Sequence, residues 1–143
     1  MFHHHHVTAG RTSALLTALL LVSCKPGPTE SPPSAPAGSR LVVVSGDAQE
    51  GVACSLLESS LVVRLESASG ESLAGYSVNW GVTQSSGDLP TQEMRTNGDG
   101  QASATWLLGR GQTQHVIVSS GQAESATFTA VASPNPTAAK TCS

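Results

Sequence analysis

Two stretches between positions 61 and 80 alternate apolar and polar residues with a period of two. The connection between them is polar and contains glycine. A two-residue period gives each stretch one buried face and one wet face, as in a β-strand. Both are therefore predicted to be strands of one sheet whose inner side covers a core. The inward positions are Leu61, Val63 and Leu65 in the first stretch and Tyr76, Val78 and Trp80 in the second.

Further short segments with strand character lie on both sides of this pair. Residues 49–57 are interpreted as a strand switch or a loop. Pro90 places its segment at a sheet edge, where a missing backbone donor is tolerated. Residues 97–100, Asn-Gly-Asp-Gly, predict a tight turn, because Asn-Gly adopts positive φ at low cost. With no convincing helix, the pattern predicts an all-β Greek-key sandwich of about seven strands. The further strands are expected at residues 41–44, 89–96, 102–108, 113–119 and 125–131.

The first 23 residues have the layout of a secretory signal peptide. Arg11 lies in a polar region, and an apolar run follows at residues 14–22. That run is far shorter than the ~20 residues of a membrane-spanning helix. Its ending, Leu21-Val22-Ser23-Cys24, resembles the lipobox of bacterial lipoproteins. The resemblance implies cleavage before Cys24, acylation of Cys24 and a membrane partner reached through the lipid. Lys25, which is not aspartate, implies an outer-membrane location in a double-membraned bacterium.

Residues 24–39 are predicted to be the lipidated cysteine and a disordered linker. The segment 25–39 carries five prolines and no large apolar residue. Each proline removes a backbone donor and fixes φ, so neither helix interior nor central strand is expected. An extended polyproline spacer of this length would reach up to ~45 Å. The domain is then expected at residues 40–132, with a C-terminal tail at 133–143.

Four motifs in order resemble the bacterial Ig-like domain of the invasin and intimin group. They are LVVRLESASGESLAG, YSVNWGV, TNGDGQASATWLLG and SATFTAVA, and together they cover about residues 41–132. Trp80, where the family usually has phenylalanine, and Cys54 depart from the pattern. The resemblance implies an Ig-like fold and an adhesive or stalk-like use at a cell surface. The expected partners are proteins or cell-envelope material contacted through loops.

The charge of the chain argues against nucleic-acid binding. The formal net charge is −3, and removing residues 1–23 takes away Arg11 and no acid, which leaves six basic against ten acidic residues, or −4. Nucleic-acid binding needs a clustered basic face. The basic residues here are isolated along the sequence.

The polar residues do not form a recognisable catalytic or metal motif, and no cofactor is expected. His3 to His6 could chelate a metal but lie upstream of the predicted cleavage point. His115 is the only other histidine, and a packed, hydrogen-bonded side chain is the favoured interpretation. Residues 97–100 lack the rest of a calcium loop. A non-enzymatic adhesion, binding or structural module is therefore predicted. The alternative is a small cell-envelope hydrolase or accessory subunit using an acidic pair such as Asp88 and Glu93.

The aromatic residues and the remaining cysteines complete the expectations. Tyr76, Trp80, Trp106 and Phe128 all fall on inward positions, which argues against an exposed aromatic platform for sugars. With Cys24 lipidated, Cys54 and Cys142 remain as a pair in an oxidising compartment. They either form a disulfide, because Cys54 should lie near the exit of the last strand, or stay as two independent thiols.

Overall fold

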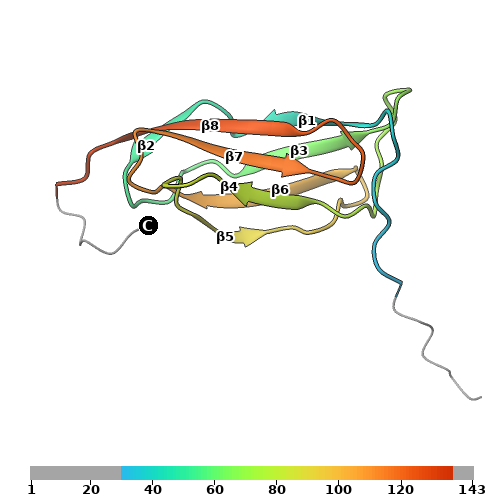
Figure 1. The fold of residues 1–143 in the computed structure, drawn as a ribbon, viewed down its shortest axis with the longest axis horizontal. Helices are drawn as coiled ribbons and strands as arrows, with labels where there is room; N and C mark the ends of the chain where they lie inside the picture. The colour runs from blue at the N-terminus through green and yellow to red at the C-terminus, as the bar shows by residue number, and fades with distance from the viewer. Residues whose placement is uncertain (1–29, 137–143) are drawn as a thin grey trace, which may run out of the picture.

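In the part of the chain that the structure describes, eight strands form two four-stranded sheets that pack face to face (Figure 1). The structure is a computed structural model, and it describes residues 30–136. One sheet has the order β1-β3-β6-β5 and the other β2-β8-β7-β4. The strands are β1 (Arg40–Ser45), β2 (Gln49–Val52), β3 (Leu61–Glu66), β4 (Asn79–Val82), β5 (Asp88–Gln92), β6 (Gln101–Leu107), β7 (Thr113–Ser119) and β8 (Ala126–Ser133).

This topology is that of an immunoglobulin-like sandwich, and it confirms the predicted fold class. In such domains the first, second, fifth and fourth strands form one sheet, and the third, sixth and seventh form the other. Here β1 and β2 are two parts of the first strand, which switches sheets at about Gly46. The second part, β2, runs parallel to β8, with Gln49 opposite Ala130. Residues 49–52 are therefore the strand switch that was one of the two alternatives.

The two alternating stretches that define the sequence lie in different sheets, so their predicted pairing within one sheet is wrong. Residues before β4 first bond to the chain that follows β5, since the Val78 N–H donates to the Met94 carbonyl at 2.9 Å. From Asn79 onward the chain pairs with β7 in the opposite sheet. The error has a simple cause. A period of two defines which face of a strand is buried, and strands of both sheets bury a face against the same core.

The core fills the space between the two inner faces. The predicted inward residues Leu61, Val63 and Leu65 are fully buried from one sheet, and Phe128 is fully buried from the other. On β6 the alternation is complete, from Ala102 to Trp106. Every buried hydrophobic residue of the described chain lies between positions 35 and 132. The core of the described chain therefore lies within this segment.

The two tryptophans approach the core from opposite sheets but are buried to different extents. Trp106 has no exposed surface, and its indole Nε1 donates to the Ser86 carbonyl at 2.7 Å. Trp80 is only half-buried; it stacks on Phe128 with ring centroids 6.2 Å apart and donates to the Glu93 carbonyl at 2.9 Å. The predicted burial is confirmed for Trp106 and only partly for Trp80. Tyr76 is likewise half-buried against the core.

The packed body begins earlier than residue 40, where the sequence places the start of the domain. The Ser77 N–H donates to the Pro33 carbonyl at 2.9 Å, and the Gln122 N–H donates to the Ala35 carbonyl at 3.0 Å. Ala35 and Ser39 are buried, with 2% and 4% of their surface exposed. The last part of the proline-rich segment thus lies against one end of the sandwich. Prolines permit this because carbonyl groups alone make the contacts.

The predicted tight turn at residues 97–100 is present, with its positive φ at a different position. The Gly100 N–H closes the turn onto the Asn97 carbonyl at 3.0 Å. Gly100, not the Asn-Gly pair, has positive φ, at 72°. Asn97 contributes through its side chain, whose Oδ1 accepts from the backbone N–H groups of Asp99 and Gln101, each at 3.0 Å. Asparagine is thus used here for its side-chain acceptor.

Within residues 30–136, no helix is long and apolar enough to cross a membrane.

Candidate functional site

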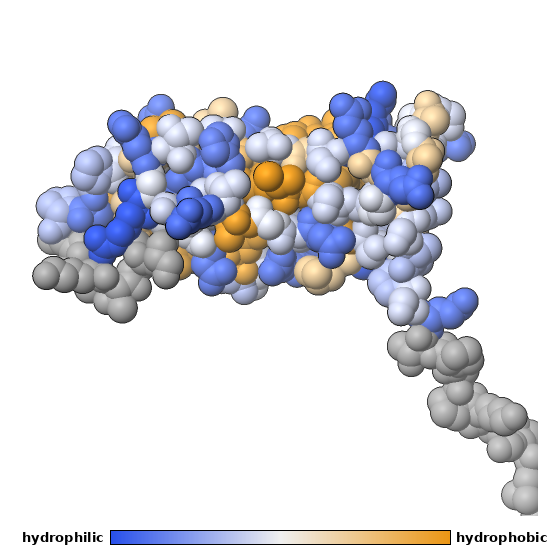
Figure 2. All heavy atoms as spheres, viewed as in Figure 1, coloured by the Kyte–Doolittle hydropathy of each residue, from blue (hydrophilic) through white to orange (hydrophobic). Residues whose placement is uncertain are grey.

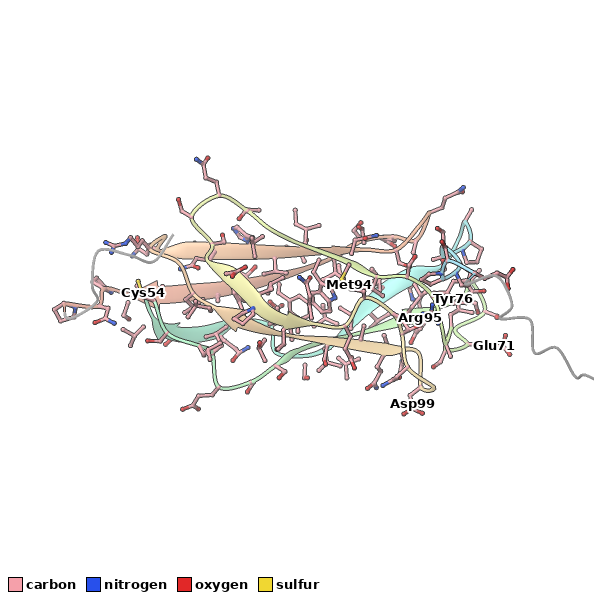
Figure 3. All side chains as sticks on the ribbon, turned by 90° about the horizontal axis from the view of Figure 1, so that it is seen from below. Cys54, Glu71, Tyr76, Met94, Arg95 and Asp99 are labelled. Atoms are coloured by element: carbon pink, nitrogen blue, oxygen red, sulfur yellow. The ribbon has the colours of Figure 1, made fainter. Side chains whose placement is uncertain are left out.

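The loops of the sandwich gather at two opposite ends. The tether end comprises residues 33–39, 67–75, 94–100 and 120–125, where the N-terminal segment reaches the body (Figure 1). The distal end comprises residues 53–60, 83–87, 109–112 and 134–136, where the chain leaves β8. Figure 3 places Cys54 at the distal end and Glu71, Tyr76, Arg95 and Asp99 at the tether end. In an Ig-like sandwich these loop clusters are the usual binding surfaces.

Glu66, on the outer face of β3 near the tether end, is almost completely covered by two arginines. Its side chain is 6% exposed. Arg40 bonds to Oε2 through Nε at 3.2 Å and Nη2 at 2.9 Å, and Arg64 bonds to Oε1 through Nε at 2.9 Å and also through Nη2. The hydrogen bonds from Arg64 and then Arg40 lower the pKa of Glu66 below its ordinary value of 4.5, against an opposing desolvation. The sequence analysis missed this cluster: Arg64 is two residues before Glu66 on β3, but Arg40 comes from β1, a different strand.

Gln114 is a fully buried polar residue that braces the distal turn at residues 109–111. Its Oε1 accepts from the Gly109 N–H at 2.8 Å. Its Nε2 donates to the carbonyls of Gly109 at 3.1 Å and Gly111 at 2.6 Å. Sequence analysis missed this role, although a signal was present. Gln114 shares its parity with the apolar residues Val116 and Val118 of the same strand, directly after a glycine-rich turn.

The structure places Cys54 close to the point where the chain leaves β8, as the sequence analysis expected. The Ala53 N–H donates to the Ser133 carbonyl at 2.9 Å, and the Asn135 amide donates to the Ala53 carbonyl at 3.1 Å. Cys54 is a disulfide-bonded cysteine. Both Cys24 and Cys142 lie outside the described residues, so lipidation of Cys24 and the pairing of Cys54 with Cys142 stay predictions.

The residues proposed for the alternative hydrolase do not come together. Asp88 and Glu93 are separated by most of β5, roughly 15 Å along an extended strand. Carboxylate pairs of glycosidases lie no more than ~9.5 Å apart. Each carboxylate also has a local partner, because Asp88 accepts from the Leu89 N–H at 2.8 Å and Glu93 from the Ser103 N–H at 2.7 Å. Asp88 and Glu93 are therefore not placed as a catalytic carboxylate pair, and each is bonded locally at the edge of the sheet.

His115 points to the outer face of its sheet. Val116 and Val118 occupy the inner face, and both are fully buried. The imidazole Nδ1 of His115 lies 3.4 Å from the Thr129 hydroxyl on the neighbouring strand. In the described part of the chain, no three His, Cys, Asp or Glu side chains lie close enough together to hold a metal ion.

A hollow on the described surface lies at the distal end, beside β2. It has a volume of about 340 Å³ and lies between β2 and residues 55–59. Leu56 and Val52 line it with 58% and 43% of their surface exposed. Sequence analysis did not identify this groove, since it treated the whole stretch as a connection.

These features define an Ig-like β-sandwich with two loop-bearing ends. Among solved structures the chain is similar to domains 4 and 5 of the S-layer protein SbsC, with a TM-score of 0.52 and 12% identity over 71% of this chain and 53% of that one. A structure of domains 4–9 of the surface layer protein SbsC gives a TM-score of 0.52 and 12% identity over 77% of this chain and 16% of that one. The structure of FdeC, an Escherichia coli adhesin, gives a TM-score of 0.48 and 18% identity over 69% of this chain and 32% of that one.

The chain spans about half the length of the first of these structures and less of the others. It matches no protein-family model and no curated protein sequence. At such identities the SbsC likeness shows the fold alone, and it agrees with the Ig-like sandwich predicted from the sequence.

Proposed function

We propose that this chain is a lipid-anchored cell-envelope protein whose Ig-like domain is a non-enzymatic binding, adhesion or structural module. The observation that carries the proposal is the docking of residues 33–39 on one end of the sandwich. Pro33 and Ala35 are bonded there to Ser77 and Gln122. A chain held at Cys24 would therefore present the tether end toward the membrane and the distal end away from it.

The docking also shortens the tether. Only residues 25–32 would remain as a free spacer, with an extended reach of ~25 Å in a polyproline conformation. The domain would stay close to the membrane, and a partner would meet its distal end first. The similar SbsC structures come from a surface-layer protein, which supports an envelope role.

Detergent phase partition of the full chain tests the anchor. Expressed with its N-terminal segment in a double-membraned bacterium, the protein should enter the detergent phase of Triton X-114, because acyl chains on Cys24 dominate its partition. A Cys24→Ala variant should stay in the aqueous phase. Equal aqueous partition of both proteins would refute the anchor.

Substitutions of Lys25, the residue after Cys24, test whether the protein is located in the outer or the inner membrane. The wild-type chain should fractionate with the outer membrane, and a Lys25→Asp variant should move to the inner membrane. A Lys25→Gln variant is the matched control, since it removes the same charge without introducing aspartate. Inner-membrane fractionation of the wild-type chain would contradict the outer-membrane location.

A further inference from the structure

We infer that the groove between β2 and residues 55–59 is a docking site for an extended segment of a partner protein that carries lysine or arginine beside apolar side chains. This inference deepens the proposed function and rests on it, because it names the kind of partner that the distal end would bind. The groove is called the β2 groove below.

Hydrogen bonds of the Gln49 side chain fix the two walls of the β2 groove relative to each other. Gln49 spans it, because its amide Nε2 donates to the carbonyls of Gly46 at 2.8 Å and Ser59 at 2.9 Å. The Ser59 N–H returns a bond to the Gln49 Oε1 at 3.2 Å. The floor is closely packed at Gly51, where an added Cβ would lie 2.9 Å from Leu57 and 2.7 Å from Leu108. A preformed groove loses little conformational entropy on binding.

An edge strand forms one wall of the β2 groove. In the described chain β2 is the outermost strand of its sheet and pairs with β8 alone. Extended peptides commonly bind along such an edge, where main-chain groups supply affinity and flanking pockets supply side-chain preference. The other wall, residues 55–59, bears Leu56, the most exposed of the large hydrophobic residues in the described chain. Val131, on the neighbouring strand β8, lies opposite Glu50 and is 43% exposed.

The charge of the β2 groove selects a basic segment. Glu50 lies on one wall and Glu58 on the other, and the described residues that line the groove include no lysine or arginine. Asp47, two residues before β2, is bonded to β8, where its Oδ1 accepts from the Thr129 N–H at 2.8 Å. Flanking carboxylates favour a cationic partner and repel an acidic one, and the effect is weakened by salt. Lys or Arg next to small apolar residues fits both properties.

Titration of the ¹⁵N-labelled chain of residues 25–143, followed by amide chemical shifts, tests the inference. The probe is the blocked peptide Val-Lys-Val-Lys-Val-Lys, with Val-Glu-Val-Glu-Val-Glu and Ser-Lys-Ser-Lys-Ser-Lys as controls. The lysine-valine peptide should shift amides of residues 49–59, weakly enough for fast exchange. The acidic peptide should bind at least tenfold more weakly, and the serine peptide should also lose affinity because Val52 and Leu56 have nothing apolar to contact.

Matched variants separate the groove from general charge attraction. The double substitution Glu50→Gln with Glu58→Gln should weaken binding about fivefold, as expected for two partly exposed ion pairs. Replacing two carboxylates at the tether end, Glu71→Gln with Glu124→Gln, should leave the dissociation constant unchanged. Leu56→Ser should weaken binding without altering the dispersion of core amide signals.

Four results of the peptide titrations would overturn the inference. They are the absence of shifts at millimolar peptide, shifts spread over both ends, equal affinity for the acidic peptide, and unchanged binding by the Glu50 and Glu58 variant. Shifts of the same amides with protein concentration alone would identify a second copy as the occupant, which also overturns it. Phase partition remains independent, so failure of the groove and failure of the anchor are distinguishable.

Discussion

At the scale of single residues, Glu66 is a carboxylate on the outer face of a sheet that two arginine side chains shield from solvent. Arg40 and Arg64 each contribute two nitrogen contacts, so both carboxylate oxygens are engaged. The ionised form is favoured, and the pKa of Glu66 is lowered from 4.5 by its hydrogen bonds to Arg64 and Arg40.

This lowered pKa predicts a pH-dependent contribution to stability. A carboxyl whose folded pKa is below its unfolded value stabilises the fold above the unfolded pKa, and that contribution is lost as the pH falls through the folded pKa. Glu66→Gln should therefore be less stable than wild type at pH 7. The difference should shrink steadily below about pH 4.5, when measured by urea denaturation from pH 7 to pH 2.

The exposed Glu71 provides the control. Glu71→Gln should leave the free energy of unfolding nearly unchanged at every pH, because surface charges contribute little. A Glu66→Gln difference that is the same at pH 7 and pH 2 would mean that the ionised carboxylate is not the stabilising form.

Trp106 is the largest fully buried side chain of the described chain. Trp106→Phe should lower the free energy of unfolding by about 2 kcal/mol or more, because the buried Ser86 carbonyl loses its donor, at ~1–3 kcal/mol, and a small cavity is left. Trp80→Phe should cost about 1 kcal/mol, since stacking on Phe128 can continue. Urea denaturation measures both.

Fluorescence checks the same assignment without reference to stability. The Trp80→Phe protein, which retains Trp106, should emit further to the blue than the Trp106→Phe protein, which retains the half-buried Trp80. The reverse order of emission would mean that the two environments are exchanged.

At the scale of elements, the two sheets are linked to each other along both sides of the sandwich. On one side the first strand does so, because the Leu41 N–H donates to the Glu124 carbonyl at 2.9 Å before β2 joins β8. On the other, the Trp80 indole crosses from β4 to the chain after β5. Pro90 in β5 has no N–H to offer at its edge. These features limit unwanted edge-to-edge pairing.

Gly87 lies in the loop between β4 and β5, at a point where this loop closely approaches the backbone at the end of β6. Its φ is 84°, and an added Cβ would lie 1.9 Å from the Leu107 carbonyl oxygen. Gly70 has a similar φ of 87° with nothing within 4 Å of such a Cβ. Gly70→Ala should therefore cost only the left-handed backbone penalty of ~1–2 kcal/mol, and Gly87→Ala should cost several kcal/mol more.

Denaturation midpoints compare these two variants at matched backbone strain. The difference between the two midpoints measures the steric clash separately from the cost of positive φ, because φ is similar at both glycines and only Gly87 approaches another segment. Equal midpoints for the two alanine variants would show that the chain between β4 and β5 can move away from Leu107, and the close approach would then have no energetic weight.

The features that the sequence predicts correctly are those set by residues close together in the chain. Local periodicity identifies β3, β6 and β8 with their inward faces, and Pro90 correctly marks an edge strand. Sheet membership of β4 is set by contacts across the molecule, so the same alternation cannot reveal it. In the Glu66 cluster, the contact with Arg40 depends on the register between β1 and β3, and the β2 groove depends on how residues 49–59 fold back on themselves. A buried Gln114 is a borderline case, because its parity is local and its acceptors are in the preceding turn.

At the scale of the whole molecule, the chain is organised along one long direction. The N-terminal segment meets one end, and the chain leaves β8 at the other (Figure 1). On the face shown in Figure 2, hydrophobic residues gather near the middle and hydrophilic ones toward both ends. An anchor before residue 30 and a partner at the distal end would therefore act at opposite ends, without competing for the same surface.

The same layout connects the cysteines to the anchor. Cys54 is disulfide-bonded, and the chain contains two other cysteines, Cys24 and Cys142. A thioether-linked lipid would occupy the Cys24 sulfur, so lipidation requires Cys142 to be the partner. Asn135 already contacts Ala53 at the distal end, seven residues before Cys142 in the sequence.

We therefore predict a Cys54–Cys142 disulfide in the mature chain. Closing a loop of about 90 residues would stabilise the fold by up to ~4–5 kcal/mol in the chain-entropy model. Residues 25–143 taken from the periplasm should show no alkylatable thiol, and Cys142→Ser should expose one and lower the unfolding midpoint. Cys54→Ser should give the same loss, since both variants open the same loop. Two alkylatable thiols in the unreduced wild-type protein would refute the bridge. A Cys24–Cys54 disulfide in the full chain would refute the bridge and the lipid anchor together, because one sulfur cannot carry both bonds.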